Sequence, residues 1–233
     1  MPKQSRLPDD AAFFQRREEL TEKEKLKGMS HSSKFAYLWE YYKYHALIIV
    51  LVIGFAVYLI HNIMTPDVET KLYAAIIDNT ISDEVWEQYQ TEVSDYLELD
   101  PKTEDAVLNY SYYFNGDAEY AMNMQTAFVT YVSAGQIDVM IAPESQFKNY
   151  AFNGFADKLY DNLPTDLYSD LTDYLYVTST EDDSEENAYG IYLTDTKLFR
   201  ENADNSDPYI LGIVANSNHK NNAIEFIRML FNQ

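Results

Sequence analysis

The chain has 233 residues, enough for one or two domains, and 46% of them are hydrophobic, as is ordinary for a protein with a packed core. Its 17 basic residues face 38 acidic ones, and a net charge of −21 excludes nucleic acid as an expected partner because phosphate backbones would be repelled. There is no cysteine, which excludes disulfides, thiolate metal sites, cysteine nucleophiles and a lipid-modified N-terminal cysteine.

The chain begins with a polar leader. Residues 1–33 mix both charge signs and carry few large apolar side chains, a composition typical of disordered or transiently helical segments. We predict a disordered cytoplasmic leader over 1–33, which is either a solvated tail or a partner-binding one.

A transmembrane helix is predicted within residues 34–65. Ala46–Met64 is a run of nineteen residues without a formally charged side chain, except for a charge that His61 could carry. A membrane span needs about 20 mainly apolar residues to cross about 30 Å of hydrocarbon. The aromatic residues just before the run suit the headgroup level, and Pro66 is expected to end the helix. A cleaved signal peptide or a buried core helix fits less well, because the run starts far from the N-terminus and is apolar on every face.

The basic residues predict the orientation of this helix. Residues 1–45 contain nine basic and seven acidic residues, whereas residues 64–233 contain eight and thirty-one. Because lysine and arginine accumulate on the cytoplasmic side, the N-terminus is expected in the cytoplasm. The protein is then a single-pass protein of the cell membrane, held in the lipid bilayer by Ala46–Met64, with residues 66–233 outside the cell.

The first part of the outer domain alternates strand and helix patterns. Apolar runs of strand length and segments of helical period, with Ser82 as a helix cap and Gly135 as a C-terminal glycine cap, predict strands at 71–78, 106–114 and 138–142 and helices at 83–97 and 118–134. Such alternation predicts right-handed crossovers and a largely parallel sheet.

The second part is less regular. Short helices are expected within 149–176, an acidic loop at Glu181–Asn187, strands at Tyr189–Leu193 and Tyr209–Ala215, and a closing helix whose apolar face runs from Ala223 to Phe231. The predicted fold class is α/β, with a single largely parallel, mixed-edge sheet that has helices on both faces and is preceded by one transmembrane helix.

Two segments carry a resemblance to a known family. SAGQIDVMIAPESQFKNYAFNGFADKL (Ser133–Leu159) resembles the part of type 2 periplasmic or extracellular solute-binding proteins in which a small-Gly-x-x-Asp-hydrophobic strand precedes a helix and a Gly-x-hydrophobic-x-x-Leu turn. LGIVANSNHKNNAIEFIRMLF (Leu211–Phe231) resembles their later Gly-Ile-x-x-x-Ser strand and its following helix. The leader KFAYLWEYYKYHALII is similar to that of single-pass proteins of Gram-positive, clostridia-like bacteria.

The resemblance implies one solute-binding-protein-like lobe. Solute-binding proteins close two α/β lobes on a ligand, whereas residues 70–233 are near the size of a single lobe. A cleft between two lobes is therefore not expected within this chain, and the apolar helix replaces the usual lipid-anchored cysteine.

Candidate ligand-binding residues follow from the predicted sheet. Ligands of open parallel sheets sit beyond the C-terminal ends of the strands, near helix N-termini. The residues at those positions are Asp78, Asn79, Asn115, Gly116, Glu144 and Ser145. The alternative for Glu144 and Ser145 is that they only start a helix.

The sequence carries no recognised catalytic, cofactor or metal motif. The four histidines lack metal spacing, the acidic loop lacks the alternation of a calcium loop, and there is no P-loop, Gly-x-Ser-x-Gly or dinucleotide fingerprint. We therefore expect no metal, no cofactor and no enzyme activity.

Three functions stay open. The leading one is a membrane-anchored extracytoplasmic binding or interaction module that joins a membrane or extracellular protein partner or senses a small solute. The others are a tethered solute receptor for an ABC-type transporter and a hydrolase with an unrecognised site.

Overall fold

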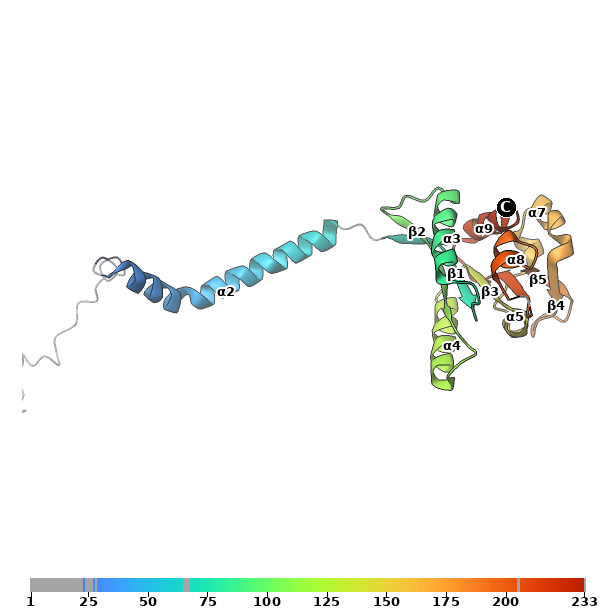
Figure 1. The fold of residues 1–233 in the computed structure, drawn as a ribbon, viewed down its shortest axis with the longest axis horizontal. Helices are drawn as coiled ribbons and strands as arrows, with labels where there is room; N and C mark the ends of the chain where they lie inside the picture. Colours follow the sequence, from blue (N-terminus) through green and yellow to red (C-terminus); the bar gives the residue numbers. More distant parts are fainter. Residues whose placement is uncertain (1–22, 24–26, 28, 65–67, 205, 233) are drawn as a thin grey trace, which may run out of the picture. The chain divides into compact units, whose positions relative to one another are not determined.

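A computed structural model describes residues 23, 27, 29–64, 68–204 and 206–232 (Figure 1). Contacts divide the chain into two compact units, 1–65 and 66–233. Most of the predicted leader, and Pro66 as the end of the apolar helix, lie outside the described residues.

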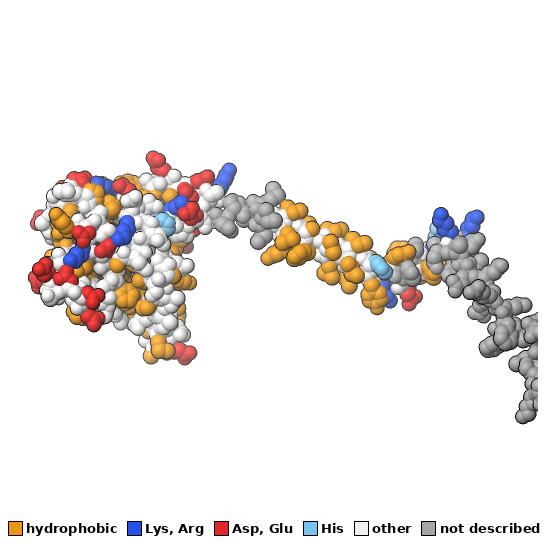
Figure 2. All heavy atoms as spheres, turned by 180° about the vertical axis from the view of Figure 1, so that it is seen from behind, with side chains coloured by type: hydrophobic (Ala, Val, Ile, Leu, Met, Phe, Trp, Pro, Cys, Tyr) orange, Lys and Arg blue, Asp and Glu red, His pale blue; other side chains and the backbone are white. Residues whose placement is uncertain are grey.

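The first unit is dominated by helix α2 (His31–Met64). Within it, Tyr42–Ile60 has a mean hydropathy of 2.1, and none of this stretch is buried against other parts of the protein. Apolar side chains cover the helix on the face seen in Figure 2. The helix is therefore long and apolar enough to cross a membrane. The candidate span begins at Tyr42 and so includes Lys43 and His45, which precede the predicted apolar run Ala46–Met64.

The second unit is built on one six-stranded sheet. Its strands lie in the order β2-β1-β3-β6-β5-β4. Their bounds are β1 (Glu69–Ile77), β2 (Glu104–Tyr112), β3 (Val139–Pro143), β4 (Leu175–Thr178), β5 (Asn187–Tyr192) and β6 (Tyr209–Ile213). The α/β class with a single sheet is confirmed.

The expectation of a largely parallel sheet holds for only half of it. Strand β1 pairs in parallel with β2 and β3, but the pairs β3–β6, β5–β6 and β4–β5 are antiparallel. The one helix between β5 and β6, α8 (Lys197–Asn202), has six residues and spans only about 9 Å at 1.5 Å per residue. Because this is shorter than the strands, the helix does not carry the chain back across the sheet, and β6 runs antiparallel to β5.

Helices cover both faces of the sheet, as predicted. One face packs against α3 (Asp83–Tyr96), α8, α9 (Lys220–Phe231) and the short helices α6 (Leu159–Asn162), α7 (Thr165–Asp170) and η1 (Thr172–Tyr174). The other face packs against α4 (Ala118–Ser133) and α5 (Glu144–Phe152). Strands β3 and β6 lie at the centre and are buried at every position, which explains their unbroken apolar sequences.

The ends of α4 show how local sequence fixes an element. The Asp117 carboxylate accepts hydrogen bonds from the backbone N–H groups of Glu119 and Tyr120. At the other end Gly135 has φ +67°, and the N–H groups of Gly135 and Gln136 return to carbonyls of the last turn, the geometry of a Schellman motif. The prediction of a glycine cap at Gly135 is confirmed.

Three details differ from the sequence prediction. Ser82 occupies the N-cap position of α3, but its side chain makes no capping hydrogen bond. Strand β4 replaces the end of the region in which only short helices were expected, and α8 was not predicted. Both missed elements are six residues or shorter, so they give little periodic signal.

Candidate functional site

The predicted ligand-binding residues gather at the edge of the sheet formed by the C-terminal ends of β1, β2 and β3. The chain runs from β1 outward to β2 and then back past β1 to β3. In doubly wound sheets this reversal opens a crevice between the loops that follow β1 and β3. Asp78 and Glu144 stand directly after these two strands.

Asp78 and Asn115 are in direct contact. One Asp78 carboxylate oxygen accepts from the backbone N–H groups of Phe114 at 2.7 Å and Asn115 at 3.1 Å, and the other accepts from the Asn115 side-chain amide at 2.8 Å. Asp78 has φ +49°, a left-handed conformation that Asp tolerates better than most residues. The carboxylate therefore holds the loop after β2 against the loop after β1. Gly116 follows in this loop, and nothing lies within 4 Å of the position where its Cβ would be.

The side chain of Asn79 hydrogen-bonds to residues at the start of α3 and is not available to the crevice. Its side-chain oxygen accepts from the indole N–H of Trp86 at 2.7 Å and from the N–H of Ile81 at 2.9 Å, while its amide donates to the Ile81 carbonyl. The side chain is an internal bridge between the loop after β1 and the first turn of α3.

Glu144 and Ser145 form the start of α5, as in the alternative interpretation of the sequence. The N–H of Glu144 donates to the carbonyl of Pro208, and the N–H of Ser145 donates to the Asp207 carboxylate at 3.2 Å. Burial, together with the Glu144 carboxylate beside it, raises the pKa of Tyr192 to about 12.

Asp207 and Pro208, just before β6, and Tyr209, its first residue, therefore make contacts at the crevice. Asp207 and Pro208 take the first N–H groups of α5, and the Tyr209 hydroxyl donates to the carbonyl of Asp78 at 2.5 Å. The N–H groups of Glu144 and Ser145 at the start of α5 are the ones that would bind an anionic ligand in an open sheet. The carboxylates of Asp78, Asp117 and Asp207 already satisfy such groups at this edge, so binding by the six predicted residues stays a prediction.

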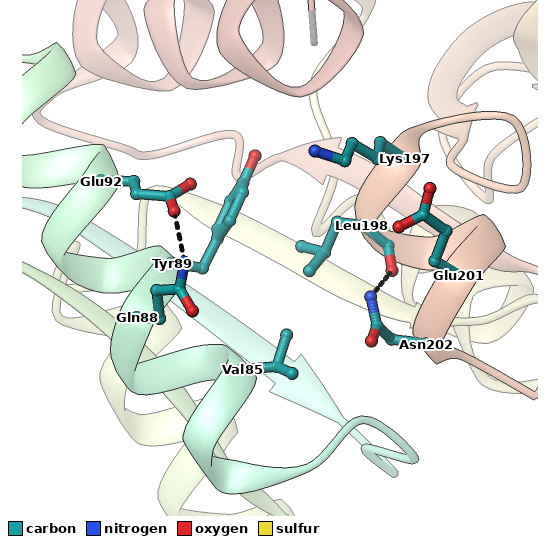
Figure 3. Close-up of a pocket in the computed structure, with 8 residues that line it drawn as sticks. All are labelled: Val85, Gln88, Tyr89, Glu92, Lys197, Leu198, Glu201 and Asn202. Carbon is teal, nitrogen blue, oxygen red and sulfur yellow. Dashed lines mark hydrogen bonds between the residues drawn. The ribbon is translucent and has the colours of Figure 1, made fainter.

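Four of the surface cavities lined by described residues contain none of the six predicted residues. One is a groove of about 240 Å³ between α3 and α8 (Figure 3). Val85, Tyr89 and Leu198 supply its apolar wall, and its polar groups are Gln88, Glu92, Lys197, Glu201 and Asn202. The sequence does not predict this groove. Helix α8 is too short to show a clear helical period, and no sequence pattern indicates that it packs against α3.

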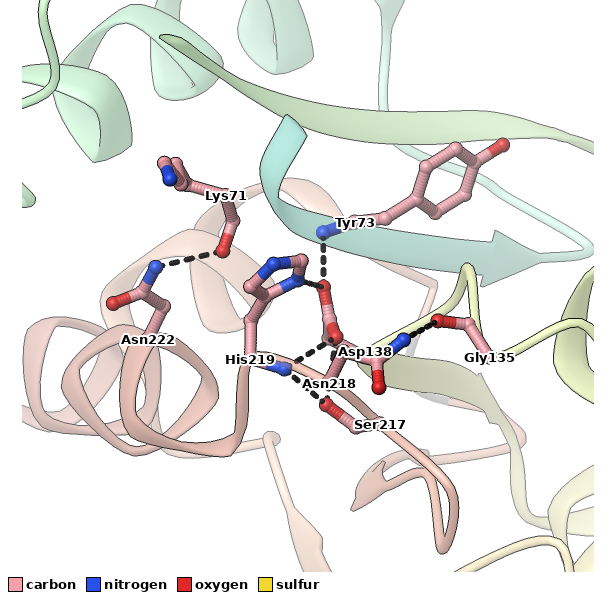
Figure 4. Close-up of polar contacts among 8 residues, drawn as sticks. All are labelled: Lys71, Tyr73, Gly135, Asp138, Ser217, Asn218, His219 and Asn222. Atoms are coloured by element: carbon pink, nitrogen blue, oxygen red, sulfur yellow. Dashed lines mark hydrogen bonds and ion pairs between the residues drawn. The ribbon is translucent and has the colours of Figure 1, made fainter. Parts of the chain in front are cut away.

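A second polar centre lies at the opposite edge of the sheet, where β3 begins (Figure 4). The side chain of Asp138 is only 1% exposed. Its Oδ2 accepts from the N–H of Tyr73 at 2.9 Å and lies 3.3 Å from Nδ1 of His219, and its Oδ1 accepts from Oγ of Ser217 at 2.6 Å and from the N–H of His219 at 3.2 Å. All the hydrogen-bonding capacity of this buried carboxylate is used, as burial of a charge requires.

The two family-like segments meet at this centre. Gly135 and Asp138 come from the first segment, and Ser217 and Asn218 from the second. Besides the Ser217–Asp138 bond, the Asn218 amide donates to the carbonyl of Gly135 at 2.9 Å. A Cβ on Gly135 would lie 3.1 Å from the Asn218 amide nitrogen, so the close approach favours glycine. Two residues of each motif thus form one hydrogen-bonded connection across β3, which neither segment reveals alone.

The arrangement of serine, histidine and aspartate is not that of a catalytic triad. In a triad the serine hydroxyl hydrogen-bonds the histidine ring, and the aspartate binds the other ring nitrogen. Here Ser217 and the ring of His219 both contact the Asp138 carboxylate. No base is positioned on the serine by these contacts, so they are structural rather than nucleophilic.

Within the described part of the chain, no group of three or more His, Cys, Asp or Glu side chains is placed to hold a metal ion. The acidic loop is instead organised by Asp183, which accepts from the Lys158 ammonium at 2.6 Å and from the N–H of Glu185 at 2.9 Å.

Protein-family models, curated proteins and solved structures were compared with the chain, and none matches it. The likeness to solute-binding proteins therefore rests on the two segments that meet at Asp138, and it stays a prediction.

Proposed function

We propose that this protein is a single-pass membrane protein whose residues 66–233 form a non-catalytic binding or interaction module outside the cytoplasm. The observation that carries the proposal is the stretch Tyr42–Ile60 of α2, which is apolar over the length of a bilayer and is not buried by any described part of the protein. An unburied apolar helix of this length is stabilised by a lipid environment.

The charge distribution supports the orientation. Eight basic residues precede the stretch Tyr42–Ile60 and a ninth, Lys43, lies at its start, whereas the domain that follows carries eight basic and thirty-one acidic residues. Because basic flanks are retained in the cytoplasm, this asymmetry supports an acidic domain outside.

The polar centres of the domain are structural contacts without the geometry of nucleophilic catalysis. The carboxylates of Asp78, Asp138 and Asp207 are each engaged by backbone N–H groups, and none of these contacts positions a nucleophile against a base. The fold that best suits these observations is a single solute-binding-protein-like lobe that presents its surface to a membrane or extracellular protein or to a small solute.

The orientation is testable because the chain has no cysteine of its own. Single cysteines replace the exposed residues Lys27 and Lys102, and intact cells are treated with a membrane-impermeant maleimide. We expect labelling of Lys102→Cys in intact cells and of Lys27→Cys only after lysis. The reverse pattern would overturn the orientation.

The interaction function is tested by cross-linking intact cells with an impermeant amine-reactive reagent before the full chain is purified. We expect a discrete adduct that is absent when residues 66–233 are deleted. Equal recovery of every cross-linked species with and without the domain would contradict the function.

A further inference from the structure

The groove between α3 and α8 contains a tyrosine hydroxyl without a partner. The residue Tyr89 is 5% exposed, and its ring packs edge to face against Trp86 and Phe226 with centroid distances of 6.4 and 6.5 Å. Its hydroxyl points into the groove (Figure 3) and has no hydrogen-bond partner among the residues that the structure describes. The ring is buried, whereas the hydroxyl oxygen is not among the buried unsatisfied atoms and is accessible from the groove, so it is free to hydrogen-bond a ligand there.

A lysine ammonium group lies across the groove from this hydroxyl. Lys197, on the first turn of α8, extends toward Tyr89 in Figure 3. Its ammonium has no ion-pair or hydrogen-bond partner within the described chain, although this domain has thirty-one acidic residues and only eight basic ones. Three of the domain's lysines, Lys71, Lys158 and Lys220, form ion pairs with carboxylates, whereas Lys197, like Lys102 and Lys148, has none among the described residues.

Two carboxylates complete the polar lining. Glu92 faces the groove from α3, where its side chain accepts from the Gln88 amide at 2.9 Å, and Glu201 faces it from α8. Burial, together with the nearby Glu92 carboxylate, raises the pKa of Tyr89, so the hydroxyl remains a donor at neutral pH. The groove therefore offers donors for an anionic oxygen and acceptors for an ammonium group within one small volume.

We propose that the groove between α3 and α8 binds a small zwitterion of amino-acid size with an apolar side chain. The ligand carboxylate lies between the Tyr89 hydroxyl and the Lys197 ammonium, and the ligand ammonium lies against Glu201 with Glu92 on the opposite wall. Val85 and Leu198 contact the apolar side chain. The volume of about 240 Å³ is just below the usual range for drug-sized ligands, which suits a smaller molecule.

The charge pattern favours a zwitterion over a simple ion. A lone carboxylate would meet Lys197 but also two glutamates in a strongly acidic domain, and a lone amine would meet the glutamates but also Lys197. Only a ligand with both charges pairs with both kinds of group.

The inference rests on the proposed binding function and names a ligand class for it. Equilibrium dialysis of the full chain in detergent micelles with radiolabelled L-leucine tests it, alongside 4-methylpentanoate and 3-methylbutylamine, which each keep one of the two charges. We expect saturable binding of leucine and at least about tenfold weaker binding of both single-charge analogues, as for the loss of a hydrogen-bonded charge.

Two variants locate the site. Tyr89→Phe keeps the packed ring and removes only the hydroxyl, and Lys197→Met removes the unpaired charge; each is expected to weaken leucine binding by about tenfold. The matched control is Lys148→Met, which removes an exposed lysine on the other face of the sheet. Thermal unfolding shows whether each variant is folded.

Absence of saturable leucine binding, or leucine binding that neither variant weakens, would overturn the inference. The cross-linking result for the domain does not depend on this outcome. A cross-linked adduct without leucine binding would exclude the groove as a ligand site but agree with the interaction function. Leucine binding without an adduct would instead exclude a protein partner of the module.

Discussion

At the scale of single residues, the buried carboxylate of Asp138 connects parts of the chain that are far apart in sequence. It stands at the start of β3, and its donors come from Tyr73 on β1 and from the loop between β6 and α9. Strands β1 and β6 lie on opposite sides of β3, so one side chain ties the parallel half of the sheet to the antiparallel half.

This role predicts the effect of Asp138→Asn. The substituted amide presents two N–H groups to a site whose neighbours are themselves donors, so at least one pair of donors must face each other. We expect a loss of about 3 kcal/mol in the free energy of unfolding, in the range for breaking a buried charged network. Urea unfolding followed by tryptophan fluorescence measures it, with Asp182→Asn in the exposed acidic loop as the control. Equal stability of the two variants would contradict this role.

At the scale of elements, the position of helix α5 depends on the aromatic ring of Phe147, which packs against two glycines of the sheet. Phe147 is fully buried, and a Cβ on Gly190 of β5 or on Gly212 of β6 would lie 2.8 Å from its ring. At Gly190 that Cβ would also lie 2.4 Å from a methyl group of Ile210. The absence of side chains at adjacent positions on two strands therefore sets how closely α5 approaches the sheet.

Gly212→Ala should force this ring to move. We expect a destabilisation of about 1–3 kcal/mol, as for overpacking of a core. Combining it with Phe147→Leu should cost less than the sum of the two single changes, because the smaller side chain leaves space for the new methyl group. The measurement is thermal or urea unfolding of the wild type, the two single variants and the double variant. If the two losses of stability simply add, the proposed contact between residues 147 and 212 is wrong.

The acidic loop between β4 and β5 is fixed by one ion pair. Hydrogen bonding to Lys158 is the main cause that lowers the pKa of Asp183, and the N–H of Glu185 adds to it. A lowered carboxyl pKa in the folded state stabilises the protein above the unfolded pKa of about 4, and this contribution is lost as the pH falls through the folded pKa.

We therefore expect Asp183→Asn to lower the urea midpoint at pH 7, and the difference from the wild type to shrink as the pH is lowered toward 3. Glu186→Gln, a change at an exposed position in the same loop, serves as the control. A difference that stays constant from pH 7 to pH 3 would mean that packing, and not the charge of Asp183, fixes the loop.

The elements also show what the sequence can predict. Both ends of strands β1, β2 and β3 and of helices α3 and α4 lie within two residues of their predicted bounds, because each element carries a local apolar period or a cap such as Gly135. The direction of β6 has no such signal, since it depends on which strand it pairs with. The predicted largely parallel, mixed-edge sheet is therefore confirmed only in part: β1, β2 and β3 pair in parallel, and the other pairs are antiparallel.

Parts of the candidate sites were predictable from the sequence, and parts were not. The sequence placed Asp78, Asn115 and Glu144 at one edge correctly, because the ends of neighbouring parallel strands meet there. It could not show that Asp207, more than sixty residues after Glu144, hydrogen-bonds the start of α5. Nor could it bring Tyr89 and Lys197 to one groove, since that contact exists only after α3 and α8 pack on the same face.

At the scale of the whole molecule, charge and apolar surface distinguish an acidic folded domain from an apolar helix. The domain of residues 66–233 buries its apolar side chains on both faces of its sheet and carries thirty-one acidic residues. The stretch Tyr42–Ile60 has a mean hydropathy of 2.1 and buries none of itself in the protein. A folded acidic domain remains in water, so within the described residues the proposed membrane attachment depends on this stretch.

Charges at the centre of the stretch should therefore release the protein from membranes. Each aspartate at the middle of a span costs about 2.5–3.5 kcal/mol in helix insertion, so Val52→Asp with Phe55→Asp is expected to remove most of the preference for the bilayer. Alkaline carbonate washing of isolated membranes is the measurement: the wild type should stay with the lipid, and the double variant should be extracted. Ser32→Asp with Ser33→Asp adds the same charges to α2 before its apolar part and should leave the protein in the membrane. Extraction of the wild type, or retention of the central variant, would mean that the helix is not the anchor.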